Sequence, residues 1–238
     1  MALAIAITLA LLPSVLILRY FLKHDAFPEP RDSIAKTFAW GVASIVPAVI
    51  LAMILILLLS GVSADDTTGA IVRAAILAFF GAAIPEELFK FAVLFFYCRR
   101  LNDFDEPMDG IVYGVTVSLG FATLENVLYV FNGGIGLAII RGFTAVPGHA
   151  LFGVIMGFYF GLAHFGPRNR KLLWTAYLLP VLFHGLYNMP LMALQSDVSD
   201  VSAFWVLLSI LVLVVGLITA RRLHRRVRSA QAPRAAEA

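Results

Sequence analysis

The chain has a single cysteine and few charged residues. Because Cys98 has no second cysteine to pair with, no intrachain disulfide can form. Charged residues make up 14% of the 238 positions and hydrophobic residues 61%, whereas soluble proteins average roughly 25% and 45–50%. The sequence also lacks a Gly- or Pro-rich linker, a low-complexity run and a clear internal repeat. These absences exclude a disulfide framework and argue against a separate soluble module.

Long apolar segments take up most of the chain instead. A helix needs about 20 apolar residues to cross a bilayer, and segments of that order alternate here with short polar connections. We predict membrane-spanning helices at Leu3–Tyr20, Phe38–Ser60, Ala70–Tyr97, Gly110–Phe131, Leu137–His164, Leu172–Leu194 and Ala203–Ala220. Helices satisfy the backbone polar groups in lipid. The predicted fold is therefore an all-α, polytopic membrane helix bundle of about seven transmembrane helices, a single integral membrane domain over residues 1–238.

Basic residues gather on one side of this predicted bundle. Fifteen of the 18 lie in alternate connections and in the basic tail 221–238, whereas the opposite side carries only Arg73 and Arg141. By the positive-inside rule, we expect a multi-pass protein of the cell membrane with its N-terminus outside and its C-terminus cytoplasmic. The first span lacks a basic segment before it and a cleavage site after it, so we expect it to be retained. Lipid headgroups explain the basic tail better than nucleic acid does.

Three ionisable residues, Glu86, Glu87 and Lys90, occupy one turn inside an apolar span. Each charge at that depth costs roughly 2.5–3.5 kcal/mol on insertion scales, so function is the default explanation. Pro85 and two glutamates suit the first turn of a helix, which predicts that a half-helix begins at Ile84. Glu86 and Lys90, four residues apart, are expected to pair. A purely structural ion pair would not explain Glu87, whereas two carboxylates suit general acid and base catalysis.

Glu125 and His149 are further polar residues within predicted spans. Glu125 shares a helix face with Phe121; the alternative is an interfacial glutamate at a helix end marked by Asn126. His149 heads a stripe of glycines, and glycines let another helix approach closely, which predicts that His149 faces the bundle interior. The alternative is a histidine that serves packing alone. The stripe contains Gly153, Gly157 and Gly161.

His184 and Asn188 again lie four residues apart, so both side chains can donate toward one point, as an oxyanion requires. Two histidines with one or two carboxylates also suit zinc, which takes three protein ligands and a water in catalytic sites. The sequence has no His-Glu-x-x-His, the strong signature of a zinc protease. Whether the cofactor is zinc or the site is metal-free therefore stays open from the residues alone.

Four motifs in order on successive predicted helices resemble the PrsW family of intramembrane proteases, which is related to the type II CAAX prenyl endopeptidases. They are Glu86-Glu87-x-x-Lys90, Phe121-x-x-x-Glu125-Asn126, Gly148-His149-Ala150-Leu151-Phe152 and His184-Gly185-x-x-Asn188. The resemblance covers roughly residues 74–190, the expected catalytic core, and includes the run Met108–Gly114 before the second motif. The CAAX relatives usually end the first motif in Arg and the second in His. Lys90 and Glu125 favour the PrsW branch.

The resemblance implies an intramembrane endopeptidase that cleaves a single-span or membrane-anchored protein, for example a membrane-bound anti-sigma factor in regulatory site-one proteolysis. A glutamate-activated water and a metal-bound water are both open as mechanisms. From the residues themselves, we expect Glu86 or Glu87 to act as general base and Lys90 to tune the pair. Glu125 and His149 would orient the water or bind a metal. His184 and Asn188 would stabilise the oxyanion.

Two other classes of function fit the same buried residues. A proton-coupled transporter or channel also uses intramembrane Glu, Lys and His, although many transporters show inverted repeats that this chain lacks. A non-catalytic scaffold would use the glycine stripe to bind other membrane helices. Incubation of the purified protein with a single-span test substrate separates the three, because only a protease produces new peptide termini.

Overall fold

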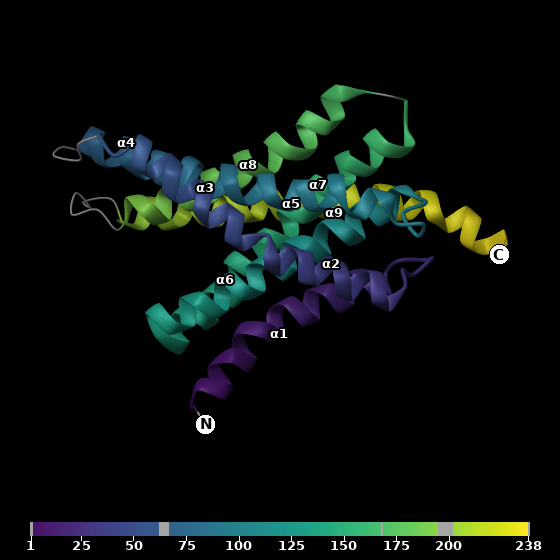
Figure 1. Ribbon diagram of the computed structural model, residues 1–238, viewed down its shortest axis with the longest axis horizontal. Helices are drawn as coiled ribbons and strands as arrows, with labels where there is room; N and C mark the ends of the chain where they lie inside the picture. The colour runs from purple at the N-terminus through teal and green to yellow at the C-terminus, as the bar shows by residue number, and fades with distance from the viewer. Residues whose placement is uncertain (1, 62–66, 168, 195–201, 238) are drawn as a thin grey trace.

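The computed structural model describes residues 2–61, 67–167, 169–194 and 202–237, and nearly all of them are helical (Figure 1). The all-α prediction is confirmed. The helices are α1 (Ala2–Lys23), α2 (Arg31–Ala43), α3 (Ile45–Leu58), α4 (Thr67–Ala78), α5 (Ile84–Phe96), α6 (Pro107–Phe143), α7 (Ala145–Phe165), α8 (Arg170–Ala193) and α9 (Ser202–Glu237). A π-helical segment, Phe79–Ala83, joins α4 to α5, and a 3₁₀ turn, Cys98–Arg100, follows α5.

Five stretches of the described residues are long and apolar enough to cross a membrane. The stretches are Arg31–Leu58, Thr68–Arg100, Pro107–Phe131, Gly133–Phe165 and Phe204–Gln231. The multi-pass helix bundle is therefore confirmed. The count of seven spans and the orientation of the termini stay predictions.

The predicted break before Ile84 takes a different form in the structure. The chain stays helical, but Ile84 N–H donates to the carbonyl of Phe79, five residues back. Pro85 has no N–H to donate to a preceding carbonyl, so an ordinary α-helical ladder is interrupted here in any case. Such π-segments often occur at functional sites. This one places Glu86 and Glu87 in the first turn of α5.

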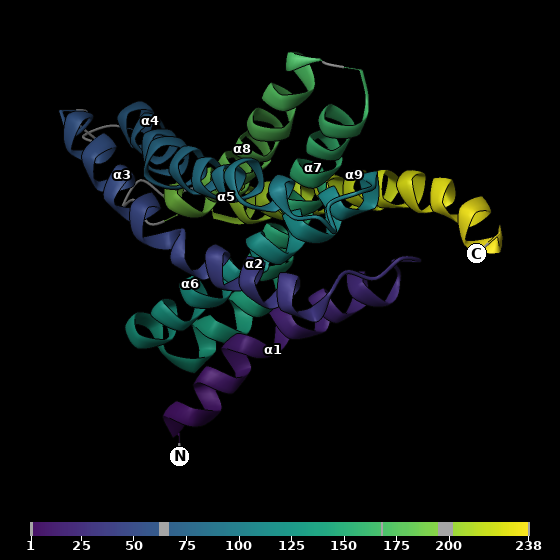
Figure 2. The ribbon, with the colours of Figure 1, turned by 45° about the vertical axis from the view of Figure 1, so that its right-hand side comes forward.

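α6 is the central helix of the bundle and contacts α1, α2, α5, α7 and α9. α1 runs along it in both views (Figure 1 and Figure 2). α6 does not end near Asn126, as the alternative interpretation of Glu125 assumed; Asn126 is buried and donates to the carbonyl of Ala10 at 3.3 Å. The backbone leaves the helical conformation at Gly134, where φ is 72°. Only glycine adopts that value readily.

The glycine stripe of α7 packs directly on the backbone of α6, which confirms the predicted close approach. A Cβ at Gly157 would collide with the carbonyl of Gly110, and one at Gly153 would collide with the carbonyl of Gly114. His149, at the head of the stripe, is 3% exposed and therefore faces the interior.

Gly157→Ala should destabilise the bundle, because the new methyl group would clash with backbone atoms of α6, which cannot move aside as a flexible side chain can. Overpacking of this kind costs about 1–3 kcal/mol. Gly216→Ala is the matched control, since its Cβ would meet only the side chains of Leu151 and Phe183 at 3.6 and 3.7 Å. Thermal unfolding in detergent should show a lower Tm for Gly157→Ala alone. Equal Tm values for both variants would contradict the close packing of α6 on α7.

Candidate active site

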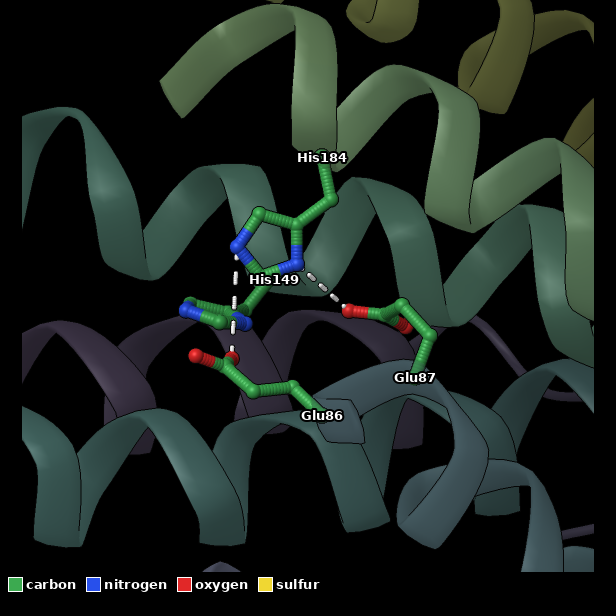
Figure 3. Close-up of side chains that lie close together, drawn as sticks. All are labelled: Glu86, Glu87, His149 and His184. Atoms are coloured by element: carbon green, nitrogen blue, oxygen red, sulfur yellow. Dashed lines mark hydrogen bonds and ion pairs between the residues drawn. The ribbon is translucent and has the colours of Figure 1, made fainter. Parts of the chain in front are cut away.

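Three helices bring the predicted site residues together in the bundle interior (Figure 3). α5 supplies Glu86 and Glu87, α7 supplies His149, and α8 supplies His184. One nitrogen or carboxylate oxygen of each of these four residues lies within 4.8 Å of the others. The two glutamates of α5 lie 62 to 98 positions before the two histidines in the sequence, yet all four residues form one compact polar cluster.

Lys90 lies at the centre of this cluster and is fully buried. Its Nζ is 2.8 Å from Glu87 Oε1, 2.8 Å from His149 Nδ1 and 3.5 Å from Glu86 Oε2. The ammonium also stands 4.3 Å from the centroid of the Phe121 ring. The sequence predicted Glu86 as the partner of Lys90, whereas Glu87 is the closer one. Residues three apart also adjoin on a helix, and Glu87 is the glutamate that faces the core.

The hydrogen bonds of Lys90 fix the tautomer of His149. An ammonium only donates, so His149 Nδ1 must accept and Nε2 must carry the proton. Nε2–H then donates to Glu125 Oε2 at 2.9 Å. Glu125 is thus the hydrogen-bond partner of His149 and lies outside the group of four potential ligands. Such a carboxylate orients a histidine ring and fixes its tautomer.

Arg141 holds the other oxygen of Glu125 and is the residue that sequence reasoning missed. Its Nη2 lies 2.9 Å from Glu125 Oε1, and its guanidinium stands 3.7 Å from the centroid of the Tyr129 ring. On a straight helix the 16 residues between Glu125 and Arg141 would span about 24 Å. The departure from helical geometry at Gly134 therefore lets the chain return to the site. The only signal in the sequence was a rare basic residue on the side expected to face outward.

His184 completes the cluster from α8. Its Nδ1 lies 2.8 Å from Glu87 Oε1, and its ring stacks on Phe152 with centroids 5.2 Å apart. Because a carboxylate accepts, Nδ1 carries the proton, and in the neutral ring Nε2 has a lone pair. Nε2 is 3.9 Å from Glu86 Oε2. Asn188 is half-buried and has no hydrogen bond to any described residue, so its predicted role beside His184 stays a prediction.

Glu86 and Glu125 face a cavity of about 220 Å³, which α3 borders with small and aliphatic side chains. A water molecule takes up roughly 30 Å³ in the liquid, so the cavity has room for several. The side chains of Glu86 and Glu125 are 15% and 17% exposed, whereas those of Glu87 and Lys90 are fully buried. Glu86 is therefore the glutamate of the pair that can meet water directly.

The donor set of the cluster fits a metal ion of the zinc class. Zinc sites take imidazole nitrogens and carboxylate oxygens, which His149, His184, Glu86 and Glu87 provide within 4.8 Å. Glu87 Oε2 is also buried without a hydrogen-bond partner. Lys90 is the competitor, because its ammonium already binds Glu87 Oε1 and His149 Nδ1. A metal held by those two atoms would have to displace it.

Comparisons with known proteins place this sequence in a family. A family model described as PrsW family intramembrane metalloprotease matches residues 29–218. A relative from Geobacillus kaustophilus, named Protease PrsW, is 42% identical over 183 residues, or 76% of this chain and 77% of the relative. Proteins of the same name from Oceanobacillus iheyensis and Bacillus subtilis are 37% and 34% identical, and each match covers 89% of the relative. These two matches cover 84% and 85% of this chain. No solved structure gives a significant match.

Lys90→Met should strongly destabilise the fold. It leaves the buried carboxylate of Glu87 without its cation, and breaking a buried ion pair costs about 3–5 kcal/mol. Adding Glu87→Gln to Lys90→Met removes the stranded charge, so the double variant should recover much of the lost Tm but no activity. Lys36→Met is the control, because its pair with Asp32 is exposed and such pairs contribute little. A double variant as unstable as Lys90→Met would show that the two charges do not stabilise each other.

Proposed function

The chain belongs to the PrsW family of intramembrane metalloproteases, and we propose that its buried cluster hydrolyses peptide bonds with Glu86 as the general base. The protein is an intramembrane protease with a membrane protein as substrate. One observation carries the assignment of the base. Glu86 alone of the two adjacent glutamates faces the cavity with room for several waters, while Glu87 is fully buried and bonds to Lys90 and His184 through its Oε1.

In the proposed reaction, Glu86 removes a proton from a water in the cavity as that water attacks the carbonyl carbon of the scissile bond. The same carboxyl group then gives the proton to the departing amine, as a general base that turns acid. Lys90 bonds to Glu87, and Glu87 in turn fixes the ring of His184. Arg141 and Glu125 fix His149 in the same way.

We assign Glu87, His149 and His184 as the residues that would hold a metal ion, which leaves Glu86 beside them as the general base. A zinc ion held there would lower the pKa of a bound water and polarise the substrate carbonyl. His184 fits this assignment better than the oxyanion role expected from the sequence. Its Nδ1 proton is donated to Glu87, so the neutral ring offers Nε2 as a lone pair and not as a donor.

The substrate we propose is a single-span or membrane-anchored protein whose cleavage is regulatory, such as an anti-sigma-factor-like protein. The relatives named Protease PrsW support proteolysis as the activity. We further propose the topology expected from the basic residues, with the N-terminus outside and the tail in the cytoplasm of a cell. Arg141, from the side proposed to face outward, reaches Glu125, so the site would lie toward the outer side of the membrane.

Glu86→Gln should lower cleavage by roughly 10²–10⁴-fold, as expected for a lost general base, because it keeps the size of the side chain and removes only the base. The assay measures new peptide termini from a single-span test substrate incubated with purified protein. Glu86 is partly exposed, so expression and Tm should stay close to those of the parent. Asp32→Asn, an exposed carboxylate change, is the control and should cleave normally. Near-normal cleavage by Glu86→Gln would eliminate Glu86 as the base.

Metal analysis of active, purified protein tests the assignment of ligands. We expect one zinc ion per chain, lost with activity on chelation and in His184→Ala. Glu125→Gln should keep zinc but bind it about 10–100-fold more weakly, the usual effect of changing a partner of a ligating histidine. A fully active, metal-free protein would favour the glutamate-activated water alone. Equal loss of zinc in Glu125→Gln and His184→Ala would make Glu125 a ligand.

A further inference from the structure

A second group of carboxylates, two buried and one partly buried, lies where α6 begins, away from the active-site cluster. Asp109 lies in the first turn of α6, and Asp25 and Glu29 come from the loop between α1 and α2. One carboxylate oxygen of each lies within 4.8 Å of the others. Asp109 precedes Glu125 by 16 residues on α6, or about 24 Å along the helix axis. The two groups of acidic residues are therefore distinct.

Asp109 is fully buried and only half satisfied. Its Oδ2 accepts the backbone N–H groups of Asp105 and Glu106 at 2.7 and 2.6 Å, which explains why an acidic residue stands in this first turn. Its Oδ1 is buried without any hydrogen-bond partner. Capping of the helix therefore accounts for one oxygen of this carboxylate and leaves the other without a role.

Two further side-chain oxygens in this region are also buried without a hydrogen-bond partner. Asp25 is 7% exposed; its Oδ1 accepts from the amide of Gln231 at 2.8 Å, but its Oδ2 has no partner. Gln231, on α9, is 3% exposed, directs its amide group at Asp25 and Glu106, and leaves its own Oε1 without a partner. Buried polar atoms are nearly always hydrogen-bonded, and exceptions point to an ion or water. Here three such oxygens come from three separate segments.

The charges of this group are also uncompensated. Glu29 Oε2 accepts from the hydroxyl of Tyr113 at 3.0 Å, and that hydroxyl has another acceptor, Asp103, at 2.7 Å. Within the described residues, the ion pairs do not include Asp25, Glu29 or Asp109. Buried carboxylates without a cation are strongly disfavoured. The group therefore calls for a bound cation or a bound proton.

We propose that Asp25, Glu29 and Asp109 form a binding site for a hard divalent cation, with Ca²⁺ as the best match. Ca²⁺ takes carboxylate and amide oxygens at about 2.3–2.6 Å, so oxygens on opposite sides of the ion lie about 5 Å apart. The 4.8 Å limit on the three carboxylate oxygens fits that sphere. The group contains no histidine or cysteine, which disfavours zinc. Gln231 reaches Asp25 through its amide nitrogen, and its buried Oε1, which has no hydrogen-bond partner, would turn to the ion as a neutral ligand.

Such an ion would join the α1–α2 loop, the start of α6 and the end of α9 at one point. Gln231 is the part of α9 that reaches this group, through Asp25 and Glu106. By mass action, a ligand bound only by the folded arrangement raises stability with its concentration. Calcium should therefore stabilise the docking of the basic tail on the bundle.

The competing explanation is a proton in place of the cation. Burial, and next its contact with Asp109, raise the pKa of Glu29 to about 9. A protonated Glu29 would donate to Asp109 and remove one charge. The two explanations differ in measurable ways, because only the first gives saturable binding of a metal.

The test is calorimetric titration of the full-length, chelator-treated protein in detergent, first with CaCl₂ and then with MgCl₂. We expect one Ca²⁺ per chain, weaker Mg²⁺, and a Tm that rises with Ca²⁺. Glu29→Gln keeps the side-chain size and should weaken the affinity for Ca²⁺ at least about tenfold. Asp25→Asn is the second variant if the first fails to fold. Asp105→Asn, at an exposed neighbour, is the matched control. His184→Ala should keep Ca²⁺ binding, which separates this site from the active-site cluster.

The proposal is overturned if the parent protein shows no saturable Ca²⁺ binding up to about 10 mM, beyond the range of weak calcium sites. It is also overturned if Glu29→Gln and Asp25→Asn bind Ca²⁺ as the parent does. A parent that binds no ion, with a Glu29→Gln variant of raised Tm, would establish the shared proton in its place.

Discussion

The ammonium of Lys90 is the group on which the proposed active site depends. It is fully buried and bonds to Glu87 on its own helix, α5, and to His149 on α7. Glu87 in turn bonds to His184 on α8. With Arg141, the connected network has two cations against the carboxylates of Glu86, Glu87 and Glu125. One negative charge is left over when both histidines are neutral. This extra negative charge would favour the binding of a metal cation or a proton at this point.

Much of the architecture was predictable from the sequence, for local reasons. Long apolar runs gave the helix bundle, and the spacing of Glu86, Glu87 and Lys90 placed them on one turn. The convergence of His149 and His184 on that turn was not predictable, since it depends on how three helices pack. The choice of Glu87 over Glu86 by Lys90 depends on which face of α5 is buried, and spacing alone allows either.

Arg141 shows most clearly where sequence reasoning stops. Its charge looked like part of the topology of the outer side, because nothing local links it to Glu125. The link exists only because Gly134 adopts a φ of 72° within α6. α6 thus supplies two acidic positions of different kinds: Glu125, held by a guanidinium from its own returning end, and Asp109, which has backbone donors but no cation side chain among the described ion pairs.

The π-helical segment before α5 changes the direction in which the side chains of α5 point around the helix axis. A π-helical turn contains about one residue more than an α-helical turn. The extra residue rotates the side chains that follow by about 100° around the helix axis. α4 and α5 therefore form one continuous helix, but the positions that face the bundle in α5 are offset from those in α4. A single-residue deletion within Phe79–Ala83 would turn the carboxylates of α5 away from the two histidines without touching any of them. The alignment of the proposed active site thus depends partly on the number of residues in this segment.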